Sequence, residues 1–251
     1  MTILISLKTT PMTYLTPQIK RITQGTWRDY LEMVGDGKVG AFLAYEIYEL
    51  LIKRVGGALG LILRNLILPF LIDIRGKRVL VEDGVSFIGA KRISLGERVI
   101  ISKYCTVEAR DGGQIELQDN VFLNKYTTIV CKGGKIVLGR AVNISSHSRL
   151  GTSGVIAIGE SCLVSSHCYI GAPNHNLDDP ARTIEEKVLC KGVTIGPRVW
   201  IGSHVTVLDG VSIGEDSIIG AHSFVNKDIP KNSIAFGVPA KVVRERTSKP
   251  L

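Results

Sequence analysis

Aliphatic residues recur at every sixth position along the C-terminal part of the chain. From Ile195 the sequence reads IGPRVW, IGSHVT, VLDGVS, IGEDSI, IGAHSF and VNKDIP, six consecutive hexads that each begin with Ile or Val. A six-residue period does not fit a helix. It fits short strands, because the fifth residue of one hexad and the first of the next lie two apart and face the same side. The pattern therefore predicts a repeated set of short strands.

The hexads are grouped in threes, and each group forms an 18-residue unit. Successive units begin 22, 21, 20, 37 and 18 residues apart, so insertions fall between units. Three strands per unit predict a triangular prism, with a partial coil upstream at Val81 and Phe87. Gly often follows the aliphatic residue, where we expect a turn that uses its backbone freedom. The units begin at Leu95, Leu117, Leu138, Ile158, Ile195 and Ile213.

This pattern resembles the left-handed parallel β-helix of the hexapeptide-repeat proteins. We therefore predict an all-β left-handed parallel β-helix with an N-terminal α-helical region. The helical region is assigned to residues 1–78, and the β-helix with its C-terminal tail to residues 79–251.

The N-terminal region has a helical pattern instead. Within residues 38–54 apolar side chains recur every three to four positions, with Glu46, Glu49 and Lys53 opposite them. The next segment, ALGLILRNLILPFLIDI, is interrupted by Arg64 and Pro69 and is shorter than the ~20 residues of a spanning helix. It is either an interfacial anchor on anionic lipid, supported by Arg64 and neighbouring basic residues, or a helix packed on the prism or on another subunit.

Charge and cysteine content narrow the function classes. The net charge is +8, and residues 1–78 hold 11 Lys and Arg against 6 Asp and Glu, so any attraction to anions comes mainly from the ends of the chain. We expect no nucleic-acid partner. Five Cys without a CxxC pair favour a reducing, cytoplasmic compartment. Cys105, Cys162 and Cys168 occupy the inward fifth position of their hexads, whereas Cys131 and Cys190 fall in insertions.

One insertion is long enough to carry function. The 37-residue step contains the loop GAPNHNLDDPARTIEEKVLCKG, which includes His175, Asp178 and Asp179. Long loops inside compact domains are usually functional or disordered. An isolated histidine in a loop, however, more often has no catalytic role than a catalytic one, and composition alone does not distinguish the two.

A closer resemblance changes that weighting. From Ile158 to Arg244 the chain is similar to the acetyl-CoA-dependent O-acetyltransferases of the hexapeptide family, in NHNLDDPARTI, VWIGSHV, IIGAHSFVNKDIP and GVPAKVVR. It also resembles acyltransferases linked to bacterial surface polysaccharide synthesis. The resemblance implies an acetyl-CoA-dependent acetyltransferase without a metal, which assembles as a homotrimer with each site between two prisms.

The resemblance also implies roles for single residues. His175 would be the general base that takes the acceptor hydroxyl proton, with Asp178 or Asp179 orienting its imidazole. Ser203 would lie beside the thioester carbonyl and help to hold the developing oxyanion. The residues implied for coenzyme A are Trp200 at the cleft, Ser203, Ala221, Asn226 and Lys227 along the pantetheine arm, and Arg244 at the nucleotide; Asn226 replaces the usual threonine.

The acceptor side matches the family less well. Ser145 and Ser153 stand where longer amide or acid side chains are usual. The acceptor that we expect is a sugar hydroxyl of a surface polysaccharide or lipid-linked precursor. An enzyme acting on such a precursor would work in the cytoplasm, either free or on the inner face of the membrane.

The register alone predicts a ladder of rings. The fourth position of the middle hexad holds every histidine except His175, and adjacent coils should lie about 4.8 Å apart. We expect the ladder to border the active cleft, with His147 and His167 on the acceptor side. From the first coil to the last, the position reads Tyr104, Tyr126, His147, His167, His204 and His222.

Three other functions remain open. A zinc enzyme like the γ-class carbonic anhydrases shares the prism, but that family's two histidines five apart are missing here. A non-catalytic scaffold held at a membrane by its basic N-terminal region would not need His175. A transferase that uses acyl carrier protein would have less use for Arg244.

Overall fold

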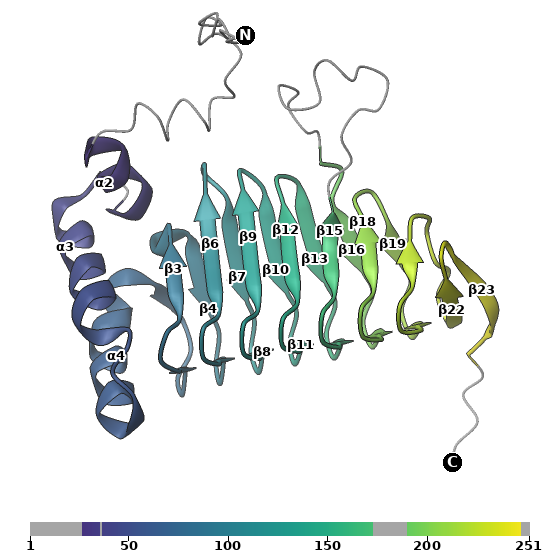
Figure 1. Ribbon diagram of the computed structural model, residues 1–251, viewed down its shortest axis with the longest axis horizontal. Coiled ribbons are helices and arrows are strands. Elements are labelled where there is room, and N and C mark those ends of the chain that lie inside the picture. The colour runs from purple at the N-terminus through teal and green to yellow at the C-terminus, as the bar shows by residue number, and fades with distance from the viewer. Residues whose placement is uncertain (1–26, 36, 173–189, 247–251) are drawn as a thin grey trace, which may run out of the picture.

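Residues 27–35, 37–172 and 190–246 are described by the computed structural model. They form a long three-sided prism with helices at its N-terminal end (Figure 1). The chain turns a corner after each hexad, so each coil contributes one strand to each side. The predicted left-handed parallel β-helix, including the partial first coil, is confirmed.

Strands of successive coils pair in parallel to form three sheets, here called A, B and C. Sheet A contains β1 (Asp73–Ile74), β4 (Ile93–Leu95), β7 (Gln114–Leu117), β10 (Lys135–Leu138), β13 (Val155–Ile158), β16 (Val193–Ile195) and β19 (Ser212–Ile213). Sheet B contains β2 (Leu80–Val81), β5 (Ile100–Ile101), β8 (Phe122–Leu123), β11 (Asn143–Ile144), β14 (Leu163–Val164), β17 (Trp200–Ile201), β20 (Ile218–Ile219), β22 (Ser233–Gly237) and the antiparallel β23 (Ala240–Glu245). Sheet C contains β3 (Ser86–Ile88), β6 (Thr106–Arg110), β9 (Thr128–Lys132), β12 (Arg149–Thr152), β15 (Tyr169–Ala172), β18 (Thr206–Leu208) and β21 (Phe224–Val225).

The core of the prism is a stack of the aliphatic first residues of the hexads. Leu95, Ile101 and Val107, for example, are fully buried. The fifth residue of the hexad also points inward and often carries a small polar group that ties its coil to the next. Cys105 Sγ donates to the Asn124 carbonyl at 2.9 Å, and Ser148 Oγ to the Ser165 carbonyl at 3.0 Å. Apolar burial and these bonds therefore hold the coils in register.

The turn glycines serve a different purpose from the expected one. Of the glycines that follow the aliphatic position in the hexads from Leu95 onward, only Gly171 has a positive φ, at 82°. Those without one include Gly96, Gly139, Gly159, Gly196, Gly202, Gly214 and Gly220. Instead the next coil lies too close for a side chain, since a Cβ on Gly202 would come within 2.6 Å of the Ala221 nitrogen. The left-handed conformation falls two residues later, as at Tyr104 with φ 59° and His147 with φ 61°. Close approach, rather than backbone freedom, explains these glycines.

The buried cysteines occupy the core, with one correction. Cys105, Cys162 and Cys168 are buried as predicted. Cys131 was expected in an insertion, but it lies within β9 and is fully buried. The strand continues past the aliphatic first position Ile129, and Ala109, Cys131 and Thr152 pair with one another across sheet C.

The N-terminal layer consists of α2 (Trp27–Gly35), α3 (Val39–Ile47) with the π-helical turn Tyr48–Ile52, and α4 (Gly57–Leu71). It supplies partners for backbone groups at the exposed edge of the first coil. Tyr48 Oη donates to the Val85 carbonyl at 2.7 Å, and the Gly84 N–H donates to the Lys53 carbonyl at 2.8 Å. A short 3-10 turn (Ala90–Arg92) follows in the first coil.

Arg64 is the largest buried side chain of this layer. Its Nε donates to the Val81 carbonyl at 2.8 Å and its Nη1 to the Val55 carbonyl at 2.7 Å. The expectation that Arg64 supports an anchor at a lipid surface is therefore wrong, because its charge faces the prism. The prism itself begins with β1 at Asp73, which pairs with β4 a few residues before the boundary expected at residue 78. No helix in the described part of the chain is long and apolar enough to span a bilayer.

Candidate active site

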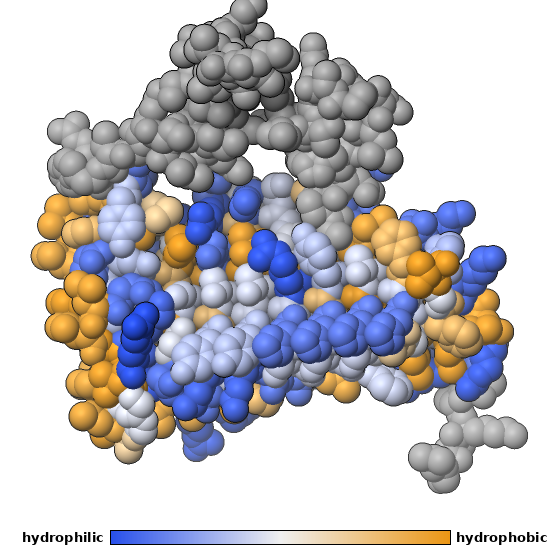
Figure 2. Space-filling view, in the orientation of Figure 1, coloured by the Kyte–Doolittle hydropathy of each residue, from blue (hydrophilic) through white to orange (hydrophobic). Residues whose placement is uncertain are grey.

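A ladder of six stacked rings runs along the corner between sheets B and C. Neighbouring ring centroids lie 4.7 to 5.2 Å apart. The histidine rings are nearly parallel, with interplanar angles of 2° to 6°. Figure 2 shows the row as a band of hydrophilic side chains along the prism. The predicted ladder is confirmed, and its members are Tyr104, Tyr126, His147, His167, His204 and His222.

The backbone holds this ladder in place. Each ladder residue has a φ of about 60°, from 59° to 61°, which directs its side chain outward at the corner. Its N–H donates to the carbonyl of the preceding coil's third position, as from His167 to Ser146 at 3.1 Å and from His222 to Ser203 at 2.9 Å. The four imidazoles are exposed, so their polar ring edges are available to a ligand.

Several predicted site residues share this corner. Ser145, Ser203 and Ala221 lie in the turns that carry the ladder, and Ser203 is directly beside His204. Trp200 precedes that turn on β17, is 47% exposed, and donates from Nε1 to Ser165 Oγ at 3.2 Å. The corner thus combines hydroxyls, imidazoles and one exposed indole.

The described residues stop and resume at another corner, between sheets C and A. They stop at Ala172, the end of β15, and resume at Cys190, so the predicted residues His175, Asp178 and Asp179 lie outside the described residues. Ser153 belongs to this corner, where its Oγ donates to Cys190 Sγ at 3.2 Å. The structure therefore does not bring Ser153 to the ladder, as a shared acceptor site within one chain would require.

Asp209 fixes the point where the chain returns. Its carboxylate accepts from the N–H groups of Lys191 and Gly192 at 2.6 and 2.7 Å. Sequence reasoning missed this residue, although an Asp before Gly210 in the turn of the next coil is a common partner for free backbone N–H groups. We regard Asp209 as a positioning residue for the loop.

The remaining coenzyme A candidates are spread over the C-terminal coils. Asn226 and Lys227 follow β21 at the far end of sheet C from the ladder, and both are exposed. Arg244 lies on β23 opposite Ile234 and is also exposed. These residues therefore lie on different sheets, with Asn226 after a strand of sheet C and Arg244 on sheet B.

Buried thiols are poor candidates for a covalent mechanism. Burial raises the pKa of the Cys105 thiol to about 11, and burial also raises the pKa values of Cys131, Cys162 and Cys168. The reactive form of cysteine is the thiolate, which these environments disfavour. These four residues are therefore structural.

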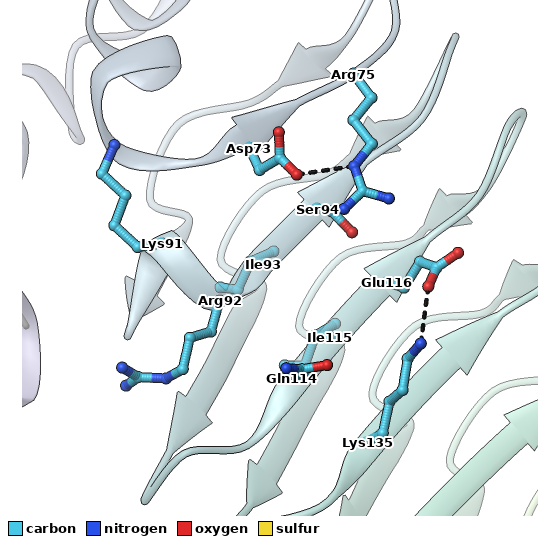
Figure 3. Close-up of a pocket in the computed structure, with 10 residues that line it drawn as sticks. All are labelled: Asp73, Arg75, Lys91, Arg92, Ile93, Ser94, Gln114, Ile115, Glu116 and Lys135. Carbon is cyan, nitrogen blue, oxygen red and sulfur yellow. Dashed lines mark hydrogen bonds and ion pairs between the residues drawn. The ribbon is translucent and has the colours of Figure 1, made fainter.

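A shallow groove of about 350 Å³ lies on sheet A near the N-terminal layer (Figure 3). Two of its four cations are paired with its two carboxylates, Arg75 with Asp73 at 2.8 Å and Lys135 with Glu116 at 3.1 Å, so the lining keeps a positive excess. The hydrogen bond from Lys135 lowers the pKa of Glu116. Because the groove lies away from the ladder and its ion pairs are exposed, we do not assign the chemistry to it.

The described residues contain no group of three or more His, Cys, Asp or Glu placed to hold a metal ion. The ladder does not form such a group, because its parallel rings are stacked at successive levels and do not converge on one point. The zinc hypothesis therefore lacks a ligand set within the ranges that the structure covers.

Comparison with known proteins places the chain in a family. The family model "Bacterial transferase hexapeptide (six repeats)" matches residues 192–227. The dTDP-4-amino-4,6-dideoxy-D-glucose acyltransferase of Escherichia coli is 32% identical over 175 residues, which cover 69% of this chain and 82% of that protein. The chain belongs to the hexapeptide-repeat acyltransferases.

Other hexapeptide-repeat acyltransferases match over smaller parts. Galactoside O-acetyltransferase of Escherichia coli strain K12 is 37% identical over 113 residues, or 45% of this chain and 55% of that protein. The chain spans about half the length of the first curated relatives that it matches, 45% and 55%. A crystal structure of AntD, an N-acyltransferase from Bacillus cereus in complex with dTDP and coenzyme A, shares the fold. Its TM-score is 0.50 at 23% identity, covering 70% of this chain and 84% of that one.

Proposed function

We propose that the protein transfers an acetyl group from acetyl-CoA to a sugar hydroxyl of a surface polysaccharide or lipid-linked precursor. The observation that carries this proposal is the alignment with a named sugar acyltransferase over 82% of that protein's length. The second relative is named for O-acetyl transfer to a galactoside. Acetyl-CoA is a co-substrate in this proposal, and the reaction needs no metal.

The proposed chemistry is direct transfer. His175 takes the proton of the acceptor hydroxyl while that oxygen attacks the thioester carbonyl. Ser203 donates a hydrogen bond to the oxyanion that develops on the carbonyl. The carbon–sulfur bond then breaks, and the coenzyme A thiolate receives the proton from the imidazolium. Since Cys105, Cys131, Cys162 and Cys168 are buried, the scheme uses no acyl-cysteine intermediate.

The proposed site is completed by a second chain. The His175 loop begins and ends at the C–A corner, and the ladder occupies the B–C corner, five residues away along β15 or about 16 Å. In a homotrimer with a site between two prisms, the loop corner of one chain would face the ladder corner of its neighbour. Ser145, His147 and His167 would then contact the acceptor from one chain, and Ser153 from the other.

The first test is loss of the base. His175→Ala should reduce thiol release from acetyl-CoA by about 10²- to 10⁴-fold, because a general base contributes that much. Coenzyme A affinity, measured by calorimetry, should stay within a few-fold. The matched control is Asn176→Ala, in the same loop. If His175→Ala keeps more than about a tenth of kcat, the assignment is wrong.

A second candidate function is N-acyl transfer to an amino sugar, which the name of the dideoxyglucose relative favours. The same assay can compare nucleotide sugars, amino-sugar nucleotides and lipid-linked oligosaccharides as acceptors. Hydroxylamine cleaves an ester product and leaves an amide intact, so treatment of the product followed by mass spectrometry separates the two. Metal analysis of the purified protein tests the zinc alternative.

A further inference from the structure

The N-terminal layer presents its most apolar surface to solvent. Nine large side chains of α3, the π-helical turn and α4 are 45% to 76% exposed. We call this set the apolar face. Figure 2 shows it as the orange surface at the helical end of the molecule. Its members are Val39, Leu43, Ile47, Leu50, Leu51, Leu59, Ile62, Leu66 and Phe70.

The helices of the layer face the prism with sides that carry polar groups, and their most apolar sides face solvent. The sides that face the prism carry Tyr45, Tyr48, Arg64 and Leu68, and Glu49 pairs with Lys53 at 2.8 Å beside Ser86. Polar groups are needed there because they bond the open edge of the first coil. A surface helix normally packs its apolar stripe inward. Here the apolar stripe faces solvent instead. Soluble monomers rarely expose a large continuous apolar patch.

Charge around the apolar face is positive. Arg54 is exposed at the turn between the π-helical turn and α4, and Lys77 and Arg78 are exposed at a corner of the first coil, on which α4 packs. Of the acidic groups on the same elements, Glu49 is paired with Lys53, whereas Glu46 accepts at 2.9 Å from the Tyr30 hydroxyl, which does not cancel a carboxylate charge. An apolar face edged by cations is complementary to a bilayer that contains anionic lipid.

We propose that the apolar face docks the protein on an anionic membrane surface, with α3 and α4 lying in the interface. The nine side chains contain only carbon and hydrogen, which suits acyl chains. The 15-residue α4 is about 22 Å long, so it lies on the bilayer rather than across it. This proposal does not depend on the acyltransferase activity.

Vesicle flotation with the full chain tests the docking. Vesicles of phosphatidylcholine with phosphatidylglycerol should carry the protein to the top of a sucrose gradient, and binding should weaken with salt. Leu50→Gln combined with Leu66→Gln should lower the partition coefficient about a hundredfold, because each fully buried Leu is worth about tenfold or more. The control is Val155→Gln, a 51% exposed apolar residue on sheet A, which should bind as the wild type does.

The basic residues are tested separately. Arg54→Gln with Lys77→Gln should lower binding to anionic vesicles about thirtyfold and leave binding to phosphatidylcholine alone unchanged. If the wild-type protein does not float, or if the Leu50 and Leu66 variant floats equally well, the proposal is wrong. Light scattering tests the alternative occupant, a second copy of the chain. If the protein self-associates but does not float, and the Leu50 and Leu66 substitutions abolish the self-association, the face binds a second copy and the docking proposal is overturned.

Discussion

At the residue scale, one backbone conformation explains the ladder. The fourth position of the middle hexad has a positive φ in every coil, and an L-residue there is disfavoured without compensation. Ring stacking compensates for part of this backbone cost, at about 0.5–1.5 kcal/mol for each aromatic pair. In the first coil the same position is Gly84, and a Cβ there would lie 2.3 Å from the Tyr104 ring. The ladder therefore ends at Gly84 because Tyr104 covers it.

Gly84→Ala should accordingly destabilise the protein through the ring contact. The matched control is Gly112→Ala, which has a similar φ, +82° against +78°, but no atom within 4 Å of the added Cβ. Urea unfolding followed by circular dichroism should show Gly84→Ala less stable than Gly112→Ala by about 1–3 kcal/mol, the usual cost of overpacking. Adding Tyr104→Ala should remove that difference. Equal midpoints for the two single variants would contradict the explanation.

At the element scale, sequence specifies the strands more completely than the helices. The hexad period requires an aliphatic first position, so strands, coils and ladder could all be predicted from residues such as Leu95 and His147. The orientation of α3 and α4 could not. Periodicity shows that a helix has an apolar side, but Arg64 and Tyr48 face the prism because the first coil offers unpaired carbonyls. Likewise, register places the ladder without showing that the loop leaves from a different corner.

Arg64→Met should loosen the N-terminal layer. The substitution leaves the Val81 and Val55 carbonyls without their donor, at about 1–3 kcal/mol for each buried group. Hydrogen exchange of peptides from α3 and α4 should become faster, while peptides from β8 onward should keep wild-type rates. Arg54→Met, an exposed neighbour, serves as the control. Unchanged protection of α4 in the Arg64 variant would show that these bonds do not hold the layer.

At the scale of the whole molecule, the layer and the prism depend on each other. Val81, Val85 and Phe87 in the first coil are almost completely buried, and Leu68, Leu71 and Ile72 from the layer belong to the same apolar core. The two parts therefore share one core, although their sequence patterns differ. Residue 78 therefore marks a change in the sequence pattern rather than a boundary between two independent folding units.

Deletion of residues 1–72 should consequently expose the first coil and cause aggregation. The deletion uncovers Phe87 and frees the Val85 carbonyl at a sheet edge, which is a template for pairing with other chains. Size-exclusion chromatography with light scattering should show large species. The full-length Leu50→Gln and Leu66→Gln variant, which leaves the first coil covered, should remain dispersed. A dispersed, folded deletion product would mean that the prism does not need the N-terminal layer to cover its first coil.

The covered first coil also gives the molecule a polarity. A solenoid can grow into a fibre only by heterologous contacts, in which the leading edge of one copy pairs with the trailing edge of the next. Here Tyr48, Lys53 and Arg64 bond to backbone groups of the leading edge. At the trailing edge β19 is bonded to Ile229, whereas β21 ends sheet C with no helix over it among the described residues. Edge pairing between copies is thus limited to tail-to-tail contact, which closes after two molecules. The same helices that complete the core therefore prevent open-ended polymerisation.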